Sequence, residues 1–315
     1  MRDLRIVFMG TPDFAVAVLQ KLVEEGKNIV GVITSPDKPS GRGRKLRRSP
    51  VKEYALSQNL HLLQPNNLKN VDFLEELKYL NANLQIIVAF RMLPKIVWDM
   101  PKYGTFNLHA SLLPQYRGAA PINWVLINGE SITGVTTFFI DEKIDTGETI
   151  LKKKVDIATN DTAGSLHDTL VLLGRELVLE TILLIEQNKV ITFKQPQVVD
   201  LKEAPKLNSE NTKIIWNQSV QIIYNFIRGL NPYPTAWSIL YNNKDKIKVK
   251  IYDCTIEINK HPHRSGTIFT TKKELKIAAT NGYIYIKVMQ LPGKQKMEVK
   301  SLLNGYSFSK DAKML

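Results

Sequence analysis

Short apolar runs alternate with helical patterns through the first 190 residues, and this alternation constrains the fold more than any other feature. Strands are predicted over Arg5–Phe8, Ile29–Thr34, Leu84–Ala89, Gly104–His109 and Val135–Ile140, and helices over Phe14–Glu25, Ser49–Gln58, Val71–Leu80 and Thr162–Gln187. A helix between two strands indicates a βαβ unit. We therefore expect an α/β fold with a Rossmann-like, mostly parallel sheet and flanking helices, whose ligands bind beyond the carboxyl ends of the strands.

The second part of the chain has a different pattern. A polar stretch with prolines, KQPQVVDLKEAPKLNSENTK, follows the last of these helices and indicates a linker. Val220–Leu230 then has a helical pattern, and short alternating strands with Asn, Asp and Gly turns run to about Tyr283–Val288. These strands predict a smaller, OB-like β-barrel of the kind that often binds oligonucleotides, in which the Lys-rich run 244–250 is an edge or exposed strand. We expect domains at 1–189 and 210–315 and a linker at 190–209.

Charge is distributed unevenly along the 315 residues. Residues 1–189 carry 23 Lys and Arg against 21 Asp and Glu, whereas residues 190–315 carry 20 against 9. Most of the net charge of +13 therefore lies in the second segment, which favours contact with a polyanion such as nucleic acid. A solvated lysine-rich surface is the alternative interpretation.

Hydropathy and cysteine content narrow the class of protein. The chain has no run of about 18 apolar residues, the length that a membrane-spanning helix needs. Its first residues, MRDLRIVFMGTPDF, contain an apolar stretch too short for a secretion signal. Cys254 is the only cysteine, which excludes an internal disulfide and a cysteine-based zinc cluster. We expect a cytoplasmic protein without a membrane partner.

The segment from Asn107 to Asp145 concentrates the groups that an acyl-transfer site needs. Asn107 and His109 lie two residues apart at the end of a predicted strand, so their side chains point to one face. An imidazole and a neutral amide together suit a developing oxyanion. A carboxylate such as Asp145 can orient the ring or take a proton from an attacking nucleophile, but it reaches the strand end only through tertiary folding.

A structural interpretation stays open for each of these residues. Asn107 and His109 would then be a polar pair at a strand end, and Asp145 would belong to a hairpin turn. The segments Ser111–Pro114 and Arg117–Pro121 follow His109 and are rich in Pro and Gly, which is typical of a pocket rim. The two leucines of the first segment are equally compatible with a core position.

A cluster of five cations occupies seven residues of the otherwise near-neutral N-terminal part: Arg42, Arg44, Lys45, Arg47 and Arg48. The interleaved glycines permit a backbone that orders on a phosphate chain. The run lacks the third glycine of a dinucleotide-binding motif and the Gly-Lys-Ser/Thr ending of a P-loop, so both are rejected. We expect a nucleic-acid contact, with a solvated charged loop as the alternative.

Two histidines and two tryptophans invite a functional interpretation that the pattern does not favour. His261 and His263 flank a proline, and without an obvious third ligand they predict a loop rather than a metal site. Trp124 and Trp237 lie in helical and strand patterns, which predicts core positions rather than base stacking.

Four segments of the chain together resemble the methionyl-tRNA formyltransferases: MGTPDFAVAVLQKL, SPDKPSGRGRKLRRSPVK, NLHASLLPQYRGAAPINW and IDTG. The resemblance runs over almost the whole chain. It implies transfer of the formyl group of 10-formyltetrahydrofolate to the α-amino group of methionyl initiator tRNA, giving N-formylmethionyl-tRNA for translation initiation. Asn-x-His with a later Asp is shared by other folate-dependent formyltransferases and hydrolases, whereas SLLPxxRGxxP and the basic loop are narrower.

The resemblance also implies roles for individual residues. The catalytic trio is matched by Asn107, His109 and Asp145. A folate-contacting segment is matched by Ser111, Leu112, Leu113 and Pro114. An insertion that enters the acceptor end of tRNA is matched by Arg42, its central arginine, with Arg44, Lys45, Arg47 and Arg48. The family implies no metal and no covalent enzyme intermediate, and we expect a monomer.

One segment, VAFRMLPK, departs from the family pattern because Arg91 replaces an expected glycine on the folate side. Arg91 is predicted to be either a substrate contact or a salt-bridge residue. The rival functions are formyl transfer to a small amine, such as a nucleotide sugar or a purine precursor, hydrolysis of the formyl folate, and nucleic-acid binding without catalysis. The small-amine function leaves the basic segments unexplained, and the non-enzymatic function leaves the intact trio unexplained.

Overall fold

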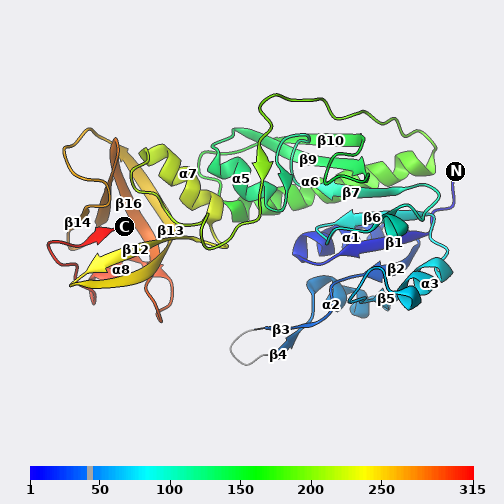
Figure 1. Cartoon of the computed structure of the whole chain (residues 1–315), viewed down its shortest axis with the longest axis horizontal. Helices are drawn as coiled ribbons and strands as arrows, with labels where there is room; N and C mark the ends of the chain where they lie inside the picture. The colour runs from blue at the N-terminus through cyan, green and yellow to red at the C-terminus, as the bar shows by residue number, and fades with distance from the viewer. Residues whose placement is uncertain (41–44) are drawn as a thin grey trace. The chain divides into compact units, whose positions relative to one another are not determined.

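The computed structural model describes residues 1–40 and 45–315, and the chain divides into two compact units (Figure 1). The first unit comprises residues 1–118, 133–155 and 167–202. The second comprises residues 119–132, 156–166 and 203–315. Each unit has its own sheet, as the two sequence patterns predict.

The first unit is built on a seven-stranded sheet in the order β10-β9-β7-β6-β1-β2-β5. Its strands are β1 (Ile6–Gly10), β2 (Ile29–Ile33), β5 (Leu62–Leu63), β6 (Leu84–Val88), β7 (Thr105–His109), β9 (Ile132–Phe139) and β10 (Thr149–Asp156). The pairs β1 with β2, β1 with β6, β2 with β5 and β6 with β7 are parallel, whereas β7 and β9 are antiparallel. The predicted mostly parallel α/β sheet is thus confirmed.

Helices cover both faces of this sheet. They are α1 (Asp13–Glu24), α2 (Pro50–Ser57), α3 (Val71–Tyr79), α4 (Lys95–Trp98) and α6 (Ala163–Glu186). Two helices begin where the side chains of Ser49 and Asn70 accept hydrogen bonds from the first turn, as N-caps do. Apolar residues of α3 and α4 pack on one face of β1 and β2, while α1 and α6 approach Leu108 of β7 on the other face.

The order in which strands are added to the sheet reverses at β1. It proceeds from β1 to β2 and β5 on one side, and then returns to β6 and β7 on the other. Ligands of open α/β sheets bind beyond the carboxyl ends of the strands next to such a reversal. Ala89, directly after β6, has a φ of +47°, and β7 ends beside it at His109. The architecture therefore predicts a site at the ends of β6 and β7.

The second unit is a small antiparallel barrel with helices. Its sheet has the order β14-β15-β16-β13-β12-β18, with β17 paired to β16. The strands are β12 (Ala236–Asn242), β13 (Asp245–Ile258), β14 (Ile268–Thr270), β15 (Leu275–Ala279), β16 (Gly282–Gln290), β17 (Met297–Glu298) and β18 (Lys313–Met314). The remaining elements are α5 (Pro121–Ile127), β11 (Glu203–Ala204), α7 (Val220–Leu230) and α8 (Val299–Leu303).

The barrel nearly closes at its last strand. A bridge pairs Thr267, just before β14, with Lys313 of β18, and the Met314 N–H donates to the Gly266 carbonyl at 2.8 Å. Gly266 has a φ of +87°, and a Cβ there would lie 2.3 Å from the Met314 carbonyl oxygen. Only glycine permits this approach, so the closure depends on it.

Three sequence-based placements in the second unit are settled by the structure. The Lys-rich run 244–250 enters β13, which lies between β12 and β16, so the edge prediction is wrong and the exposed-strand prediction is confirmed. Trp124 and Trp237 are both partly exposed rather than core residues. His261 and His263 lie in a loop as predicted, and the His261 ring packs on Tyr283 with centroids 4.4 Å apart.

In the described part of the chain, no helix combines the length and apolarity needed to cross a membrane.

Candidate active site

The end of β7 places Asn107 and His109 on one face of the first unit's sheet. In the β7–β9 ladder Asn107 pairs with Phe138, and His109 pairs with Thr136. Leu108 points to the opposite face, where a Cβ on Gly174 of α6 would come within 2.8 Å of its side chain. Packing on the far face thus fixes the direction in which the two polar side chains project.

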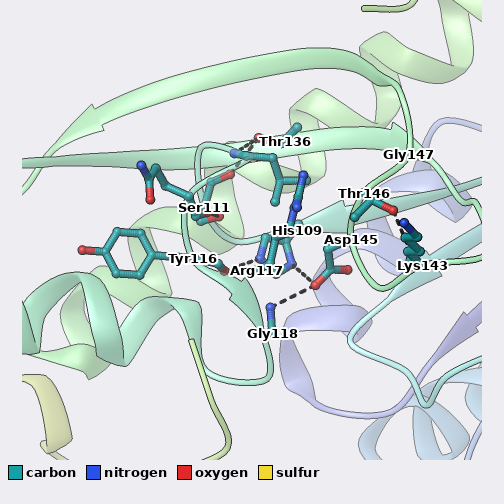
Figure 2. A network of polar contacts seen from close by, with 12 residues as sticks. His109, Ser111, Tyr116, Arg117, Gly118, Thr136, Lys143, Asp145, Thr146 and Gly147 are labelled. Carbon is teal, nitrogen blue, oxygen red and sulfur yellow. Dashed lines mark hydrogen bonds and ion pairs between the residues drawn. The ribbon is translucent and has the colours of Figure 1, made fainter. Parts of the chain in front are cut away.

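The His109 ring is buried and held through its Nε2 atom. Its Nε2 lies 2.8 Å from the carbonyl oxygen of Tyr116, and a carbonyl only accepts, so Nε2 carries a hydrogen. Its Nδ1 lies 3.8 Å from Oδ2 of Asp145; a dashed line joins the two residues in Figure 2. Nδ1 is therefore the ring atom available to reacting groups, with a carboxylate beside it.

Asp145 lies in the loop between β9 and β10. Its own φ is +55°, and its Oδ2 accepts a hydrogen bond from the Gly118 N–H at 3.0 Å (Figure 2). A Cβ on Gly147 would lie 1.7 Å from the Phe139 carbonyl oxygen, so the glycine allows the turn to close against β9. The Asp-Thr-Gly run is therefore both a hairpin turn and the support of the carboxylate.

The Asn107 amide has an unsatisfied atom. Its Oδ1 is buried and has no hydrogen-bond partner among the described residues. A buried polar atom without a partner costs about 1–3 kcal/mol, and native proteins keep few of them. Such an acceptor, on the same face of β7 as His109, marks a place where a hydrogen-bond donor of a ligand completes the site.

The loop after β7 is fastened by a buried threonine that sequence reasoning missed. Thr136 Oγ1 donates to the Ser111 carbonyl at 2.7 Å (Figure 2). It also accepts a hydrogen bond from the Leu113 N–H at 3.2 Å. Ser111 Oγ donates to the Gln115 carbonyl at 2.6 Å. Among the four residues of the predicted folate-contacting segment, only Leu112 keeps a partly exposed side chain; Ser111, Leu113 and Pro114 are buried.

Among the described residues Arg91 forms no ion pair, and its Nε is buried without a hydrogen-bond partner. Its guanidinium donates to the carbonyl oxygens of Pro65 and Asn66, the second at 2.9 Å. These carbonyls follow β5, so Arg91 ties the loop after β6 to the loop after β5. Burial lowers the pKa of Arg91.

The predicted basic loop is carried by a hairpin of two short strands, β3 (Lys38–Ser40) and β4 (Lys45–Arg47). Arg47 and Arg48 are exposed, and Lys45 begins β4. Arg42 and Arg44 lie outside the described residues. At the base of the hairpin Asp37 accepts hydrogen bonds from Lys52 at 2.8 Å and from Gln64 at 3.0 Å.

The assembled groups suit acyl transfer to an incoming nucleophile. His109 Nδ1 and the Asp145 carboxylate lie together at the end of β7, and Asn107, with an unpaired Oδ1, lies on the same face of that strand as His109. Amide and imidazole donors stabilise a developing oxyanion, and the carboxylate accepts a proton. The sequence predicts the trio, but Thr136 and the Tyr116 carbonyl carry no sequence signal because their roles arise from tertiary contacts.

Comparison with known proteins agrees with this chemistry. The formyl transferase family matches residues 4–182, and its C-terminal domain matches residues 206–307. The chain is 56% identical over 314 residues to a methionyl-tRNA formyltransferase of Flavobacterium johnsoniae, covering all of both chains. It is 51% identical over 317 residues to that of Bacteroides thetaiotaomicron, covering 99% of this chain and 98% of the relative.

Solved structures give the same fold at lower identity. An N-formyltransferase from Helicobacter canadensis, crystallised with folinic acid and dTDP-3-aminofucose, matches with a TM-score of 0.64 and 21% identity, over 93% of this chain and 100% of that one. This likeness shows the fold, and the full-length identities above show the family. The chain therefore belongs to the formyl transferase family, among its methionyl-tRNA formyltransferases.

Proposed function

We propose that this protein transfers the formyl group of 10-formyltetrahydrofolate to the α-amino group of methionyl initiator tRNA, giving N-formylmethionyl-tRNA for translation initiation. The observation that carries the proposal is the 56% identity to a methionyl-tRNA formyltransferase over the full length of both chains. The approach of Asp145 to His109, and the place of Asn107 on the same face of β7 as His109, support it with suitable chemistry.

The residues present fit a formyl donor. Bound folate supplies the formyl carbon, and the unpaired Oδ1 of Asn107 accepts a hydrogen bond from a donor group of the ligand. Leu112 offers a partly exposed apolar side chain, while Ser111, Leu113 and Pro114 act through the shape of the buried loop. The Nδ2 group of Asn107 is the donor that orients the formyl oxygen, and the loop sets the position of the folate ring.

The chain's own groups supply proton acceptance and charge stabilisation. Asn107 donates to the formyl oxygen as negative charge develops on it. His109 donates through Nδ1 when the ring carries both hydrogens, because Nε2 is committed to the Tyr116 carbonyl. As the amine attacks the formyl carbon, Asp145 accepts its proton; the bond from the formyl carbon to the folate nitrogen then breaks, and that nitrogen takes up a proton as it leaves. Asp145 also orients the ring, since its Oδ2 lies 3.8 Å from Nδ1. No serine or cysteine nucleophile takes part.

Two basic regions form the proposed contact with tRNA. The insertion would engage the acceptor end through Arg42, Arg44, Lys45, Arg47 and Arg48. The basic segment 210–315, after the 190–209 linker, would hold the body of the tRNA, while 1–189 carries catalysis. The net charge of residues 190–315, 20 cations against 9 anions, supports this division. We also propose that the protein works as a monomer in the cytoplasm.

The decisive assay compares formyl transfer to charged initiator tRNA, uncharged tRNA and free methionine. We expect transfer to the charged tRNA and none to uncharged tRNA, because the acceptor is the amino group of esterified methionine. Release of formate at equal rates with and without tRNA would indicate a hydrolase instead. Transfer to free methionine alone would overturn the proposal.

A further inference from the structure

Gln195 lies in the segment after α6, which the sequence predicts as a linker, yet its side chain reaches the candidate active site. Its Nε2 donates to the carbonyl oxygens of Asp145 and Gly147, both at 2.9 Å. Its Oε1 accepts from Arg117, at 3.2 Å from Nε and 2.6 Å from Nη2. Both donors and both acceptor positions of the amide are thus in use.

The contacts of Gln195 lie on both sides of the catalytic carboxylate. Asp145 and Gly147 flank Thr146 in the turn, so one amide group fixes the orientation of two carbonyls there. Arg117 directly precedes Gly118, whose N–H donates to Asp145 Oδ2 at 3.0 Å. Gln195 therefore connects the turn that carries the Asp145 carboxylate to Arg117, next to the Gly118 N–H that binds this carboxylate.

The turn needs such a support because Asp145 has a φ of +55°. A non-glycine residue in the left-handed region persists only where its surroundings hold it. The Asp145 carboxylate is bound by one backbone N–H, and its carbonyl is bound by Gln195. Losing the second contact lets the turn relax and moves the carboxylate away from His109.

The segment that carries Gln195 is itself fixed in register. Phe193 and Thr149 exchange backbone hydrogen bonds at 2.9 Å and 2.8 Å, next to the start of β10. Thr192 Oγ1 donates to the Glu148 carboxylate. These contacts fix the position of the backbone at Gln195 relative to the turn. Backbone pairing therefore determines which carbonyls its side chain can reach.

From these contacts we infer that Gln195 is a positioning residue, which sets the place of the Asp145 carboxylate beside His109. The inference rests on the proposed function, because it assigns Gln195 a part in formyl transfer. The two hydrogen bonds that Nε2 donates should matter most, because they bind the carbonyls of Asp145 and Gly147 in the turn. The segment after α6 is then a component of the active site as well as a connection.

Three variants test this assignment. Gln195→Met removes all four hydrogen bonds, and Gln195→Glu keeps the acceptor for Arg117 while losing the donors to the turn. We expect both to lower kcat about 10- to 100-fold, because displacement of a reacting group by about 1 Å has an effect of that size. The KM for formyl folate should change less than about threefold. Gln197→Met is the matched control, since Gln197 lies two residues away and is exposed.

A double-mutant cycle separates positioning from a general structural role. In the Asp145→Asn background, Gln195→Met should lower the remaining rate by less than about threefold, because the carboxylate that it positions is already lost. An equal fall in both backgrounds would overturn the inference. Wild-type kcat in Gln195→Glu would overturn it as well.

Amide hydrogen exchange at Gly118 gives a readout that does not depend on formyl transfer. The Gly118 N–H is protected by Asp145 Oδ2, so displacement of the carboxylate by Gln195→Met should raise its exchange rate about tenfold or more. Gln197→Met should leave it unchanged. Unchanged exchange in Gln195→Met would contradict the inference, even where the wild-type protein failed the formylation assay and the proposed function itself were lost.

Discussion

Asp145 shows how much a single residue of this site depends on its backbone. Its φ of +55° costs on the order of 1–3 kcal/mol for most side chains. Asp and Asn tolerate this region better than other non-glycine residues. The carboxylate accepts a hydrogen bond from the Gly118 N–H, which offsets part of this strain. The position is thus suited to a short polar side chain, and the reaction decides between the acid and the amide.

Asp145→Asn keeps the shape of the turn and removes the proton acceptor. Asparagine adopts the same φ, and its Oδ1 can still accept from Gly118. We expect kcat for formyl transfer to fall about 100-fold or more, since a positioned base contributes about 10²–10⁴. The dissociation constant for a formyl folate analogue, measured by calorimetry, should stay within about threefold. Near wild-type turnover would remove Asp145 from the mechanism.

Arg91→Leu tests the tie between the loops after β5 and β6. The change leaves the carbonyls of Pro65 and Asn66 without their charged donor, so we expect a loss of about 1–2 kcal/mol in the free energy of unfolding. Arg91→Lys should lose less, because an ammonium reaches one of the two carbonyls. Urea unfolding followed by circular dichroism measures both. Equal stability of Arg91→Leu and the wild type would show that the tie is not structural.

Residue roles were predictable from the sequence only where they follow from local geometry. Asn107 and His109 share a face because strand residues alternate, and the structure places them so. Thr136 and Gln195 act through contacts with residues 25 and 50 positions away, and no local pattern reports such contacts. Arg91 was ambiguous for the same reason, since its partners are backbone carbonyls of a distant loop.

At the scale of elements, the β3–β4 hairpin carries the predicted basic loop, and the contacts at its base are visible in the structure. Asp37 directly precedes β3 and binds both Lys52 of α2 and Gln64 after β5. The sequence predicts the charged loop, but it gives no sign of the two three-residue strands, which are too short for a periodic signal. The long strands and helices of the first unit, by contrast, have patterns long enough to be recognised.

The anchor of this hairpin should depend on pH. The hydrogen bonds from Gln64 and then Lys52 lower the pKa of Asp37 below its ordinary value of 3.8. A carboxyl group with a lowered folded pKa stabilises the protein above its unfolded pKa and loses that effect as the pH falls through the folded value. The stability difference between wild type and Asp37→Asn should therefore be constant above about pH 5 and shrink below about pH 4. Urea unfolding across this range measures it, and a difference that grows on acidification would contradict the anchor.

At the scale of the whole molecule, positive charge is concentrated in the C-terminal part of the sequence. Residues 190–315 carry 20 cations and 9 anions, while the larger N-terminal part is near neutral. In β13 the exposed cations Lys246, Lys248 and Lys250 alternate with Val249 and Ile251, which are buried in the barrel. The sequence predicts this alternation and the barrel, but not the interior place of β13, because strand order depends on pairing between distant segments.

Salt dependence tests whether these lysines contact tRNA. Phosphate contacts release counterions, so the KM for methionyl-tRNA should rise steeply with salt while the KM for formyl folate changes little. Replacing Lys246, Lys248 and Lys250 with glutamine should reduce the slope of log KM against log salt by about 2–3. The same change of charge at the exposed lysines Lys69, Lys78 and Lys102 is the control. If both triple variants reduce the slope equally, tRNA responds to net charge alone, and the exposed face of β13 is not its binding surface.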